Sequence, residues 1–423
     1  MTIDETKLRR TLAGLQDEVQ GLLSGLIEVQ SVRGGEGPAM RLVREALARC
    51  CDMTEFVQIP DSIRDDPDYC FRLPGINYAD RPNVRASRTG SSSTGPLFLL
   101  NTHLDVVPPS IGQEAPWVAR SRADVVYGRG ACDAKGQAAT IYAVMRALAG
   151  MNVRLPATIE AHLVVEEECG GNGTLAMVRH LQTRGASRRA DACIVLEPSG
   201  LKVMPSVRGA MWFRLKVLGR AGHSGMPGSS VSALKKAVVA IGVLEKLHDR
   251  LLAESRGNPL FDAFADPMPV TFGICQAGNW PAAAPAEAVL EGVFGFLPPR
   301  KRAEIRRLME DALRTCSDEW LREHFELTFP MLRADGNVLD VSHPLVTTMQ
   351  QSLTASGVEP QLSALTGSCD ARFYANDLAV PTVVFGPGDL GHAHGKDEQI
   401  RLGDILTAAE VIIRTFDRLA RAL

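Results

Sequence analysis

Residues 97–105 read LFLLNTHLD, a short apolar run that ends in a histidine and an aspartate. Further apolar runs of this kind lie at 158–165 (TIEAHLVV), 192–196 (ACIVL) and 381–385 (PTVVF). Helical patterns accompany them at 135–149, at 173–184 and from 403 onward. Short apolar strands that alternate with helices indicate a mostly parallel sheet with helices packed on it. We therefore predict an α/β fold.

The segment before the first run has a different pattern. Apolar residues recur at helical spacing over 7–30 and again over about 38–50, which predicts two helices. Residues 60–96 are rich in Pro, Asp, Ser and Gly, so we expect them to form mostly loop.

Residues 208–331 predict a second, inserted domain. Expected strands lie at 211–218, 268–275, 287–296 and 325–331, and expected helices at about 231–254 and 299–322. That order is β-α-β-β-α-β, the ferredoxin-like split motif. The predicted domains are therefore 1–207 and 332–423, which together form one α/β domain, and 208–331.

Composition excludes several classes of protein. The 423 residues carry 46 basic and 49 acidic side chains, a net charge of −3, so no basic excess is available to neutralise nucleic acid. There is no run of about 18 apolar residues, so we expect no membrane span. The nine cysteines are scattered without a CxxC pair and the N-terminus lacks an apolar secretion core, which predicts reduced thiols in the cytoplasm.

Chemically active side chains follow each expected strand of the α/β domain. They are His103 and Asp105; Glu166, Glu167 and Glu168; Glu197; and His392 and His394, with Asp133 just before the helix at 135. Ligands of open α/β sheets bind beyond the carboxyl ends of the strands, so one crevice would collect all these groups. An aspartate before a helix is often only an N-cap, and a glutamate run is often a solvated face. Their joint placement instead predicts a shared site for divalent metal, zinc above all.

These motifs resemble a known family. HxDVVP, GRGxxDxKG, EEExGGxGT, a later LEP and a late HGxDE occur in this order over about residues 100–400. They are similar to those of the dinuclear zinc amidohydrolases, which include acetylornithine deacetylase, succinyl-diaminopimelate desuccinylase, aminoacylase and bacterial glutamate carboxypeptidase. The inserted segment resembles the lid and dimerisation domain of that family.

The resemblance implies a metal-ligand set. His103 and Glu197 would bind one ion, His394 and Glu168 the other, and Asp133 would bridge them. The ions are expected to be zinc, with cobalt or manganese as alternatives, and one of the two sites could be empty. His392 lies two residues before His394 and competes with it, but the following Gly-Lys-Asp-Glu favours His394 by the family motif.

The resemblance also implies roles around the metals. Asp105 would orient His103 by accepting its second N–H. Glu167 would be the general base, because the family order before the Gly-Gly pair is acid, base, ligand. Neighbouring side chains of a strand point to opposite sides, so Glu167 and Glu168 can both reach the site only if the strand has already ended.

Four further residues are predicted to contact the substrate. His223 matches a lid histidine that reaches the partner subunit's site, where it would stabilise the oxyanion. Asn279 matches a lid asparagine that holds substrate. Arg372 could pair with a substrate carboxylate, and Arg208 is a weaker candidate.

The expected activity is hydrolysis of a non-cyclic C–N bond in a small N-acyl amino acid or related carboxylate, by a homodimer. The alternatives are a dipeptidase or carboxypeptidase, a deformylase or aryl-amine aminohydrolase on the same scaffold, and a non-catalytic metal-binding homologue.

Overall fold

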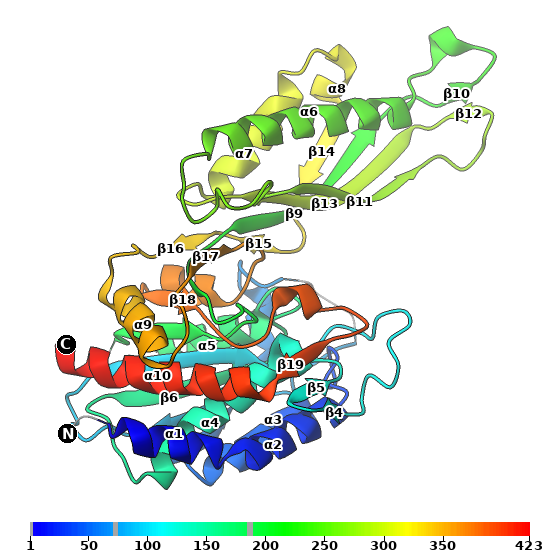
Figure 1. Cartoon of the computed structure of the whole chain (residues 1–423). Helices are drawn as coiled ribbons and strands as arrows, with labels where there is room; N and C mark the ends of the chain where they lie inside the picture. The colour runs from blue at the N-terminus through cyan, green and yellow to red at the C-terminus, as the bar shows by residue number, and fades with distance from the viewer. Residues whose placement is uncertain (1–2, 71–74, 184–188) are drawn as a thin grey trace. The chain divides into compact units, whose positions relative to one another are not determined.

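The computed structural model describes residues 3–70, 75–183 and 189–423. The chain forms two compact units (Figure 1). The first comprises Met1–Ser206, Leu339–Leu365 and Cys369–Leu423, and the second comprises Val207–Val338 with Thr366–Ser368.

The first unit is built on a mixed sheet whose centre is parallel. Its strands run in the order β1-β2-β6-β3-β7-β18-β8, and β17 also pairs with β8. Their bounds are β1 Met53–Val57, β2 Asn83–Arg88, β3 Leu97–His103, β6 Thr158–Val164, β7 Ala192–Val195, β8 Val203–Val207, β17 Leu362–Leu365 and β18 Thr382–Val384. β3 is parallel to both β6 and β7, and β18 is parallel to β7. This arrangement confirms the predicted α/β class.

Helices cover the first sheet. They are α1 (Glu5–Ala13), α2 (Gln16–Glu28), α3 (Gly37–Ala48), α4 (Gly136–Gly150), α5 (Asn172–Thr183), α9 (Pro344–Ala355) and α10 (Leu402–Ala422). α4 is buried over nearly its whole length because α2 and α10 pack on it (Figure 1). Within the described residues, no helix is long and apolar enough to cross a membrane.

A small sheet that the sequence did not predict lies beside the main one. It has the order β19-β5-β4, with bounds β4 Arg120–Arg122, β5 Val125–Tyr127 and β19 Gln399–Arg401. β19 pairs antiparallel with β5, which joins chain segments about 270 residues apart (register Gln399↔Tyr127). These strands have three residues each, too few to show an alternating pattern in the sequence.

The second unit has an antiparallel sheet of order β11-β13-β9-β14, with β15 also pairing with β9. Its elements are β9 (Gly209–Leu218), β10 (Gly222–His223), α6 (Ala233–Glu254), β11 (Val270–Ala277), β12 (Ala283–Ala284), β13 (Glu287–Phe296), α7 (Arg302–Arg314), α8 (Glu319–Glu323), β14 (Phe325–Thr328), β15 (Arg333–Ala334) and β16 (Asn337–Val338). The main elements follow the expected β-α-β-β-α-β order. The unit extends to Val338 rather than 331 because β15 is paired to β9.

Two local predictions were wrong. The helix expected over 7–30 is interrupted after Ala13, where Gly14 ends α1. The helix expected over 299–322 is divided into α7 and α8, because Asp318 caps a new helix by accepting the backbone N–H of Leu321. The segment 60–96 is mostly loop, as expected, but it also contains β2, which pairs with β1 and β6; Arg85 on β2 forms an ion pair with Glu160 on β6. Residues 71–74 of that loop, and residue 184 at the end of the helix expected over 173–184, lie outside the described residues.

Candidate metal centre

Two groups of potential metal ligands meet in the first unit and share one carboxylate. The groups are His103, Asp133 and Glu197, and Asp133, Glu168 and His394. Within each group the ligand atoms lie within 4.8 Å of one another. These are the five residues that the sequence motifs selected.

The parallel strands bring the ligands together. His103 is the last residue of β3, Glu197 follows β7 by two residues, and Glu168 follows β6 by four. Because β6, β3 and β7 are parallel neighbours, their carboxyl ends meet at one edge. Asp133 comes from a distorted helical turn, Ala131–Lys135, before α4, and His394 comes from the segment after β18.

Distances within the cluster show that Asp133 faces both groups. His103 Nε2 lies 3.0 Å from Asp133 Oδ1, and His394 Nε2 lies 3.3 Å from Asp133 Oδ2. His394 Nε2 is also 3.0 Å from Glu168 Oε1. Hydrogen bonds to Asp133 and Glu168 raise the pKa of His394 to about 10. Burial opposes charging of His103, but its bonds to Asp105 and Asp133 raise the pKa of this imidazole well above its usual value.

The donor set fits divalent cations. Burial raises the pKa of Glu197 and of Glu168, and the neighbouring carboxylates add to that rise, because like charges in a shielded space repel one another. A bound cation would remove this repulsion. Imidazole nitrogens and carboxylate oxygens are the ligands of zinc and of the related ions manganese and cobalt.

Asp105 contacts both His103 and the backbone of the glutamate turn. His103 Nδ1 is 3.0 Å from the Asp105 backbone oxygen and 3.4 Å from its Oδ1. The Asp105 carboxylate also accepts the backbone N–H groups of Glu167 and Glu168, each at 3.0 Å. The buried carboxylate therefore holds the glutamate turn as well as facing the histidine.

The three consecutive glutamates point to three different surroundings. β6 has ended at Val164, and Glu166 has a left-handed φ of 58°, so the alternation of a strand no longer applies. The Glu166 carboxylate accepts hydrogen bonds from Arg81 at 2.6 Å, the Tyr78 hydroxyl at 2.7 Å and Asn172 Nδ2 at 2.8 Å. Glu168 belongs to the second ligand group and Glu167 to neither.

Glu167 nevertheless lies beside the ligands. Burial raises the pKa of its carboxyl well above the usual value. The charges of Glu197 and Glu168 raise this pKa further, whereas the charge of His103 lowers it. The turn thus places the Glu168 carboxylate in the second ligand group and the Glu167 carboxylate outside both groups.

The side chains of His392 and His394 lie in different surroundings because the backbone turns between them. His394 has a left-handed φ of 60° and reaches Glu168 and Asp133. His392 is exposed at the end of a short helical turn, where its Nδ1 lies 3.5 Å from Gln399 Nε2.

The predicted substrate-binding residues lie in both units. In the first, Arg372 is buried, donates to the Gly170 backbone oxygen at 2.9 Å and lies over the Phe373 ring. In the second, Nε and Nη1 of Arg208 are buried and make no hydrogen bond with any described residue. His223 is the last residue of β10, which pairs with β12 at one end of this unit (Figure 1), and Asn279 lies between β11 and β12; both residues are exposed.

Sequence reasoning missed several buried residues around the site. Asp370 accepts the Thr174 hydroxyl at 2.6 Å, and burial raises its pKa to about 6. A Cβ on Gly171, whose φ is 76°, would lie 2.5 Å from Asp370 Oδ1, so this close approach requires glycine. Asp370 stands in the same GSCDARFY motif as Arg372 and could have been noticed there. Arg81 and Tyr78 lie in the expected loop, where no sequence signal marked them.

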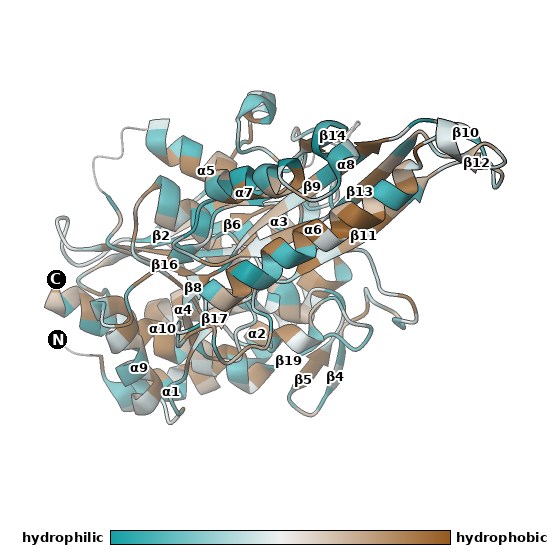
Figure 2. Cartoon of the chain, turned by 90° about the horizontal axis from the view of Figure 1, so that it is seen from above, coloured by the Kyte–Doolittle hydropathy of each residue, from teal (hydrophilic) through white to brown (hydrophobic). Residues whose placement is uncertain are grey.

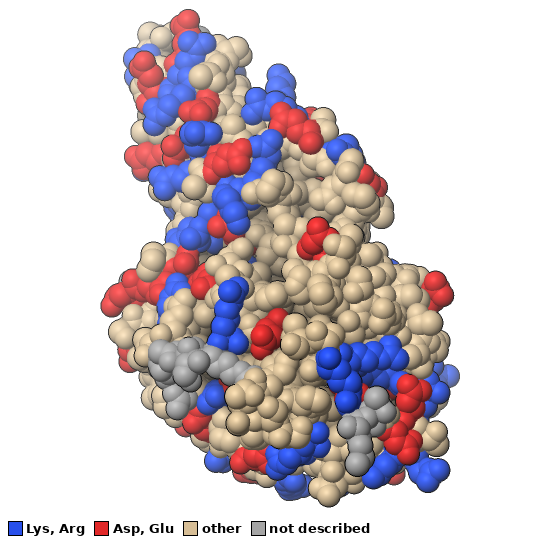
Figure 3. Space-filling view, turned by 90° about the vertical axis from the view of Figure 1, so that its left-hand side faces the viewer, with Lys and Arg blue, Asp and Glu red and all other residues tan. Residues whose placement is uncertain are grey.

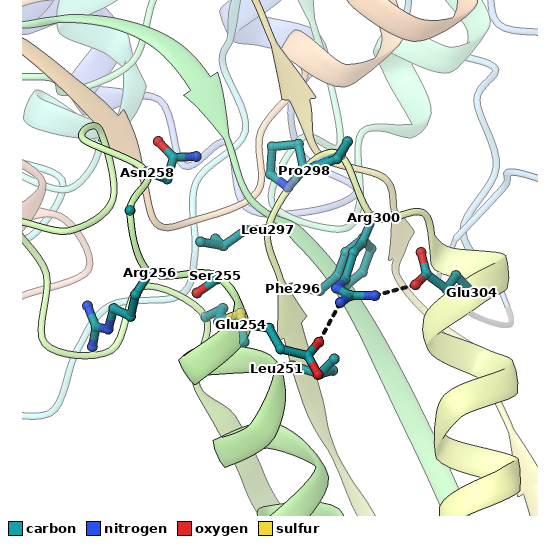
Figure 4. Close-up of a pocket in the computed structure, with 13 residues that line it drawn as sticks. Leu251, Glu254, Ser255, Arg256, Asn258, Phe296, Leu297, Pro298, Arg300 and Glu304 are labelled. Atoms are coloured by element: carbon teal, nitrogen blue, oxygen red, sulfur yellow. Dashed lines mark hydrogen bonds and ion pairs between the residues drawn. The ribbon is translucent and has the colours of Figure 1, made fainter.

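A pocket in the second unit and the charged side chains on one face are two further surface features. A pocket of about 540 Å³ in the second unit is lined by Arg300, but Glu254 and Glu304 already pair with that guanidinium (Figure 4). On the face shown in Figure 3, basic and acidic side chains are interspersed, in keeping with the small net charge. Neither feature adds a reactive group.

The fold and the ligand cluster define the class of a metal-dependent hydrolase, and comparison with known proteins identifies the family. A profile of Peptidase family M20/M25/M40 matches residues 99–418, so the chain belongs to this family. The match confirms the predicted family and a metallohydrolase that acts on C–N bonds.

Individual relatives span nearly the whole chain. A probable carboxypeptidase of Neosartorya fischeri is 27% identical, over 99% of this chain and 90% of the relative. A succinyl-diaminopimelate desuccinylase of Methylobacterium sp. is 30% identical, over 94% of each. In fold, the chain is similar to the Bacillus subtilis YXEP protein, a dinuclear metal-binding peptidase, with a TM-score of 0.67, 14% identity and coverage of 97% of this chain and 100% of the other.

Proposed function

We propose that the protein hydrolyses the amide bond of a small N-acyl amino acid or a related carboxylate. The observation that carries this proposal is the pair of ligand groups joined through Asp133, with the Glu167 carboxylate beside them but outside both. The desuccinylase relative, whose name denotes removal of an acyl group from an amino acid, supports the choice of substrate class.

His103 and Glu197 would hold one divalent ion, Glu168 and His394 the other, and Asp133 would contribute one oxygen to each. Zinc is the proposed ion, because two imidazoles among carboxylates suit it. When bound, such ions polarise a carbonyl group and lower the pKa of water towards 7.

Glu167 is the proposed general base. It would take a proton from the attacking water and return it to the leaving nitrogen. Asp105 supports this task, because its carboxylate holds the backbone of Glu167 and Glu168. The backbone of the proposed base Glu167 and that of the proposed ligand Glu168 are thus both held by the Asp105 carboxylate.

The proposed substrate carboxylate would pair with arginine. Arg208 suits this role because its buried Nε and Nη1 make no hydrogen bond within the described residues. Arg372, the stronger candidate from the sequence, donates one N–H to the Gly170 backbone oxygen and has further donors on its guanidinium group. Asn279 would hold the substrate, and His223 would donate to the developing oxyanion.

A substrate screen tests the proposed function. Purified protein with zinc, cobalt or manganese would be assayed against N-acetyl and N-succinyl amino acids, dipeptides, and N-formyl and aryl amines. We expect hydrolysis of an acyl amino acid that a chelator abolishes and added metal restores. Faster hydrolysis of dipeptides would favour the peptidase alternative, and bound metal without any hydrolysis would favour a non-catalytic homologue.

We also propose a homodimer formed through the second unit. β11 is an edge strand of its sheet, so one side of its backbone is available for pairing. Ile274 on β11 and Leu234 and Val238 on α6 are exposed apolar side chains, and α6 carries both hydrophobic and hydrophilic residues (Figure 2). Burial of such residues stabilises association.

A mixing experiment tests whether His223 acts across the dimer. We expect His223→Ala and Glu167→Gln to be nearly inactive alone, whereas a refolded equal mixture regains about a quarter of wild-type activity through one complete site per heterodimer. Activity is measured before and after mixing, with sedimentation to verify dimers. No gain in a sample that contains heterodimers would place His223 in its own subunit's site or outside the reaction.

The proposed compartment is the cytoplasm. All nine cysteines lie in the described part of the chain and are free thiols. Reduced thiols are typical of the cytosol.

A further inference from the structure

Glu398 is a buried carboxylate with an unusual set of partners. It is 1% exposed and belongs to neither ligand group. Its Oε1 accepts the backbone N–H groups of Cys132 and Asp133, both at 3.1 Å. Its Oε2 accepts the backbone N–H of Gly130 at 2.9 Å and Nη1 of Arg129 at 2.7 Å. One side chain therefore holds three backbone groups of the turn that carries Asp133.

The same residue lies only four positions after His394. The segment that contains both is attached to the Asp133 turn at further points. Gly128 N–H donates to the Glu398 backbone oxygen at 3.2 Å, and the Cys132 thiol donates to the Asp389 backbone oxygen at 3.3 Å. β19 directly follows Glu398 and pairs with β5, which directly precedes Gly128. The turn and the His394 segment are thus joined on both sides of Glu398.

The shape of the turn makes this anchor necessary. Gly130 has a φ of 83°, and a Cβ there would lie 2.7 Å from Val106 and 2.8 Å from Lys135, so the backbone is closely packed. Three N–H groups point to one place, and buried N–H groups without a partner are costly. A carboxylate satisfies them all, and Arg129 compensates its charge.

Asp105 provides a parallel elsewhere in the site. Its two oxygens accept the backbone N–H groups of Glu167 and Glu168. The ligands of the second group are therefore placed by two buried carboxylates that bind backbone. Asp105 holds the Glu168 turn, and Glu398 holds the Asp133 turn next to the His394 segment.

We propose that Glu398 is a positioning residue, which keeps the bridging carboxylate of Asp133 and the imidazole of His394 at metal-binding separation before metal arrives. This inference rests on the proposed metal centre. Because Asp133 belongs to both groups, displacement of its turn weakens binding at both sites.

The test measures metal affinity of the apoprotein rather than activity alone. In Glu398→Gln the amide oxygen can still accept from Cys132 and Asp133, but the NH₂ group faces two donors, the Gly130 N–H and Arg129. We expect zinc affinity, measured by competition with a chromophoric chelator, to fall roughly 10- to 100-fold, as for other residues that orient ligands. The visible spectrum of the cobalt-loaded protein should change as well.

Glu410→Gln is the matched control. Glu410 is also a buried carboxylate paired with an arginine, since its Oε1 lies 2.9 Å from Arg414 Nε on α10, but it belongs to neither ligand group. We expect this variant to keep wild-type zinc affinity even if its thermal midpoint falls. An equal loss of affinity in both variants would overturn the proposal, because general destabilisation would then explain it.

A second variant covers the case in which Glu398→Gln does not fold. Glu398→Asp keeps the charge but withdraws the carboxylate by one methylene, about 1.5 Å, and should also weaken zinc binding. Wild-type affinity at both sites in either folded variant would overturn the positioning role. If the wild-type protein itself bound no divalent ion, the proposed function would fail instead.

Discussion

Glu167→Gln is expected to keep both metal ions and to lower kcat by roughly 100- to 10,000-fold, the usual contribution of a general acid-base. The amide has nearly the shape of the carboxyl group but cannot take a proton from water. Glu167 is outside both ligand groups, so its replacement should not release metal. Metal content by elemental analysis and kcat on the best substrate of the screen measure the two effects separately.

The neighbouring residue supplies the control. Glu168→Gln changes the adjacent side chain, which lies 3.0 Å from His394 Nε2, and should lower metal content as well as turnover. The two variants differ by one position in the same turn, so general damage to the turn would affect them alike. If Glu167→Gln lost metal while Glu168→Gln kept it, the assignment of base and ligand would have to be exchanged.

Asp133→Asn is expected to have the second large effect, loss of bound metal from both sites together with activity. Its oxygens face different partners, with Oδ1 at 3.0 Å from His103 Nε2 and Oδ2 at 3.3 Å from His394 Nε2. An amide offers one oxygen and one NH₂ group, and NH₂ repels a cation. Metal catalysis contributes several kcal/mol, so we expect kcat/KM to fall about a thousandfold or more.

Metal stoichiometry and kcat/KM at increasing metal concentration measure this effect. The control is Asp340→Asn, an exposed aspartate whose Oδ1 accepts hydrogen bonds from the backbone N–H and the hydroxyl of Ser342. This variant should retain the wild-type metal stoichiometry and the wild-type kcat/KM. A variant of Asp133 that still bound two ions with wild-type affinity would show that this carboxylate does not bridge them.

Most of the fold and of the ligand cluster could be predicted because both depend on local sequence. A short apolar run such as 97–101, bounded by turn residues, favours a buried strand, and polar residues directly after such a strand lie at its end. His103, Glu197 and the run of glutamates at 166–168 could be found this way because β6, β3 and β7 are parallel neighbours, whereas the family resemblance was needed to select Glu168 from the run. The ligand roles themselves remain predictions that the experiments above test.

The supporting residues could not be predicted, because their partners are distant in sequence. Arg81 and Tyr78 lie in a polar segment expected to be loop, and they bind Glu166 some 85 residues away. Glu398 was visible in the HGKDE motif, but its role depends on backbone N–H groups about 266 residues earlier. A sequence shows which side chain can accept a hydrogen bond and does not show which N–H groups will face it.

The tertiary structure shows the physical basis for the choice between neighbouring residues. By itself, the sequence determined the α/β class, the order of the motifs and the five potential ligands. The family order had assigned Glu167 and Glu168 different roles, and the folded chain shows why their surroundings differ: the strand ends at Val164 and a left-handed residue turns the backbone. The family motif favoured His394 over His392, and the folded chain places the His394 imidazole beside Glu168 and Asp133. The physical reason for this division is that the residue type determines which partners a side chain can bind. The direction of the backbone determines which of those partners lie within its reach.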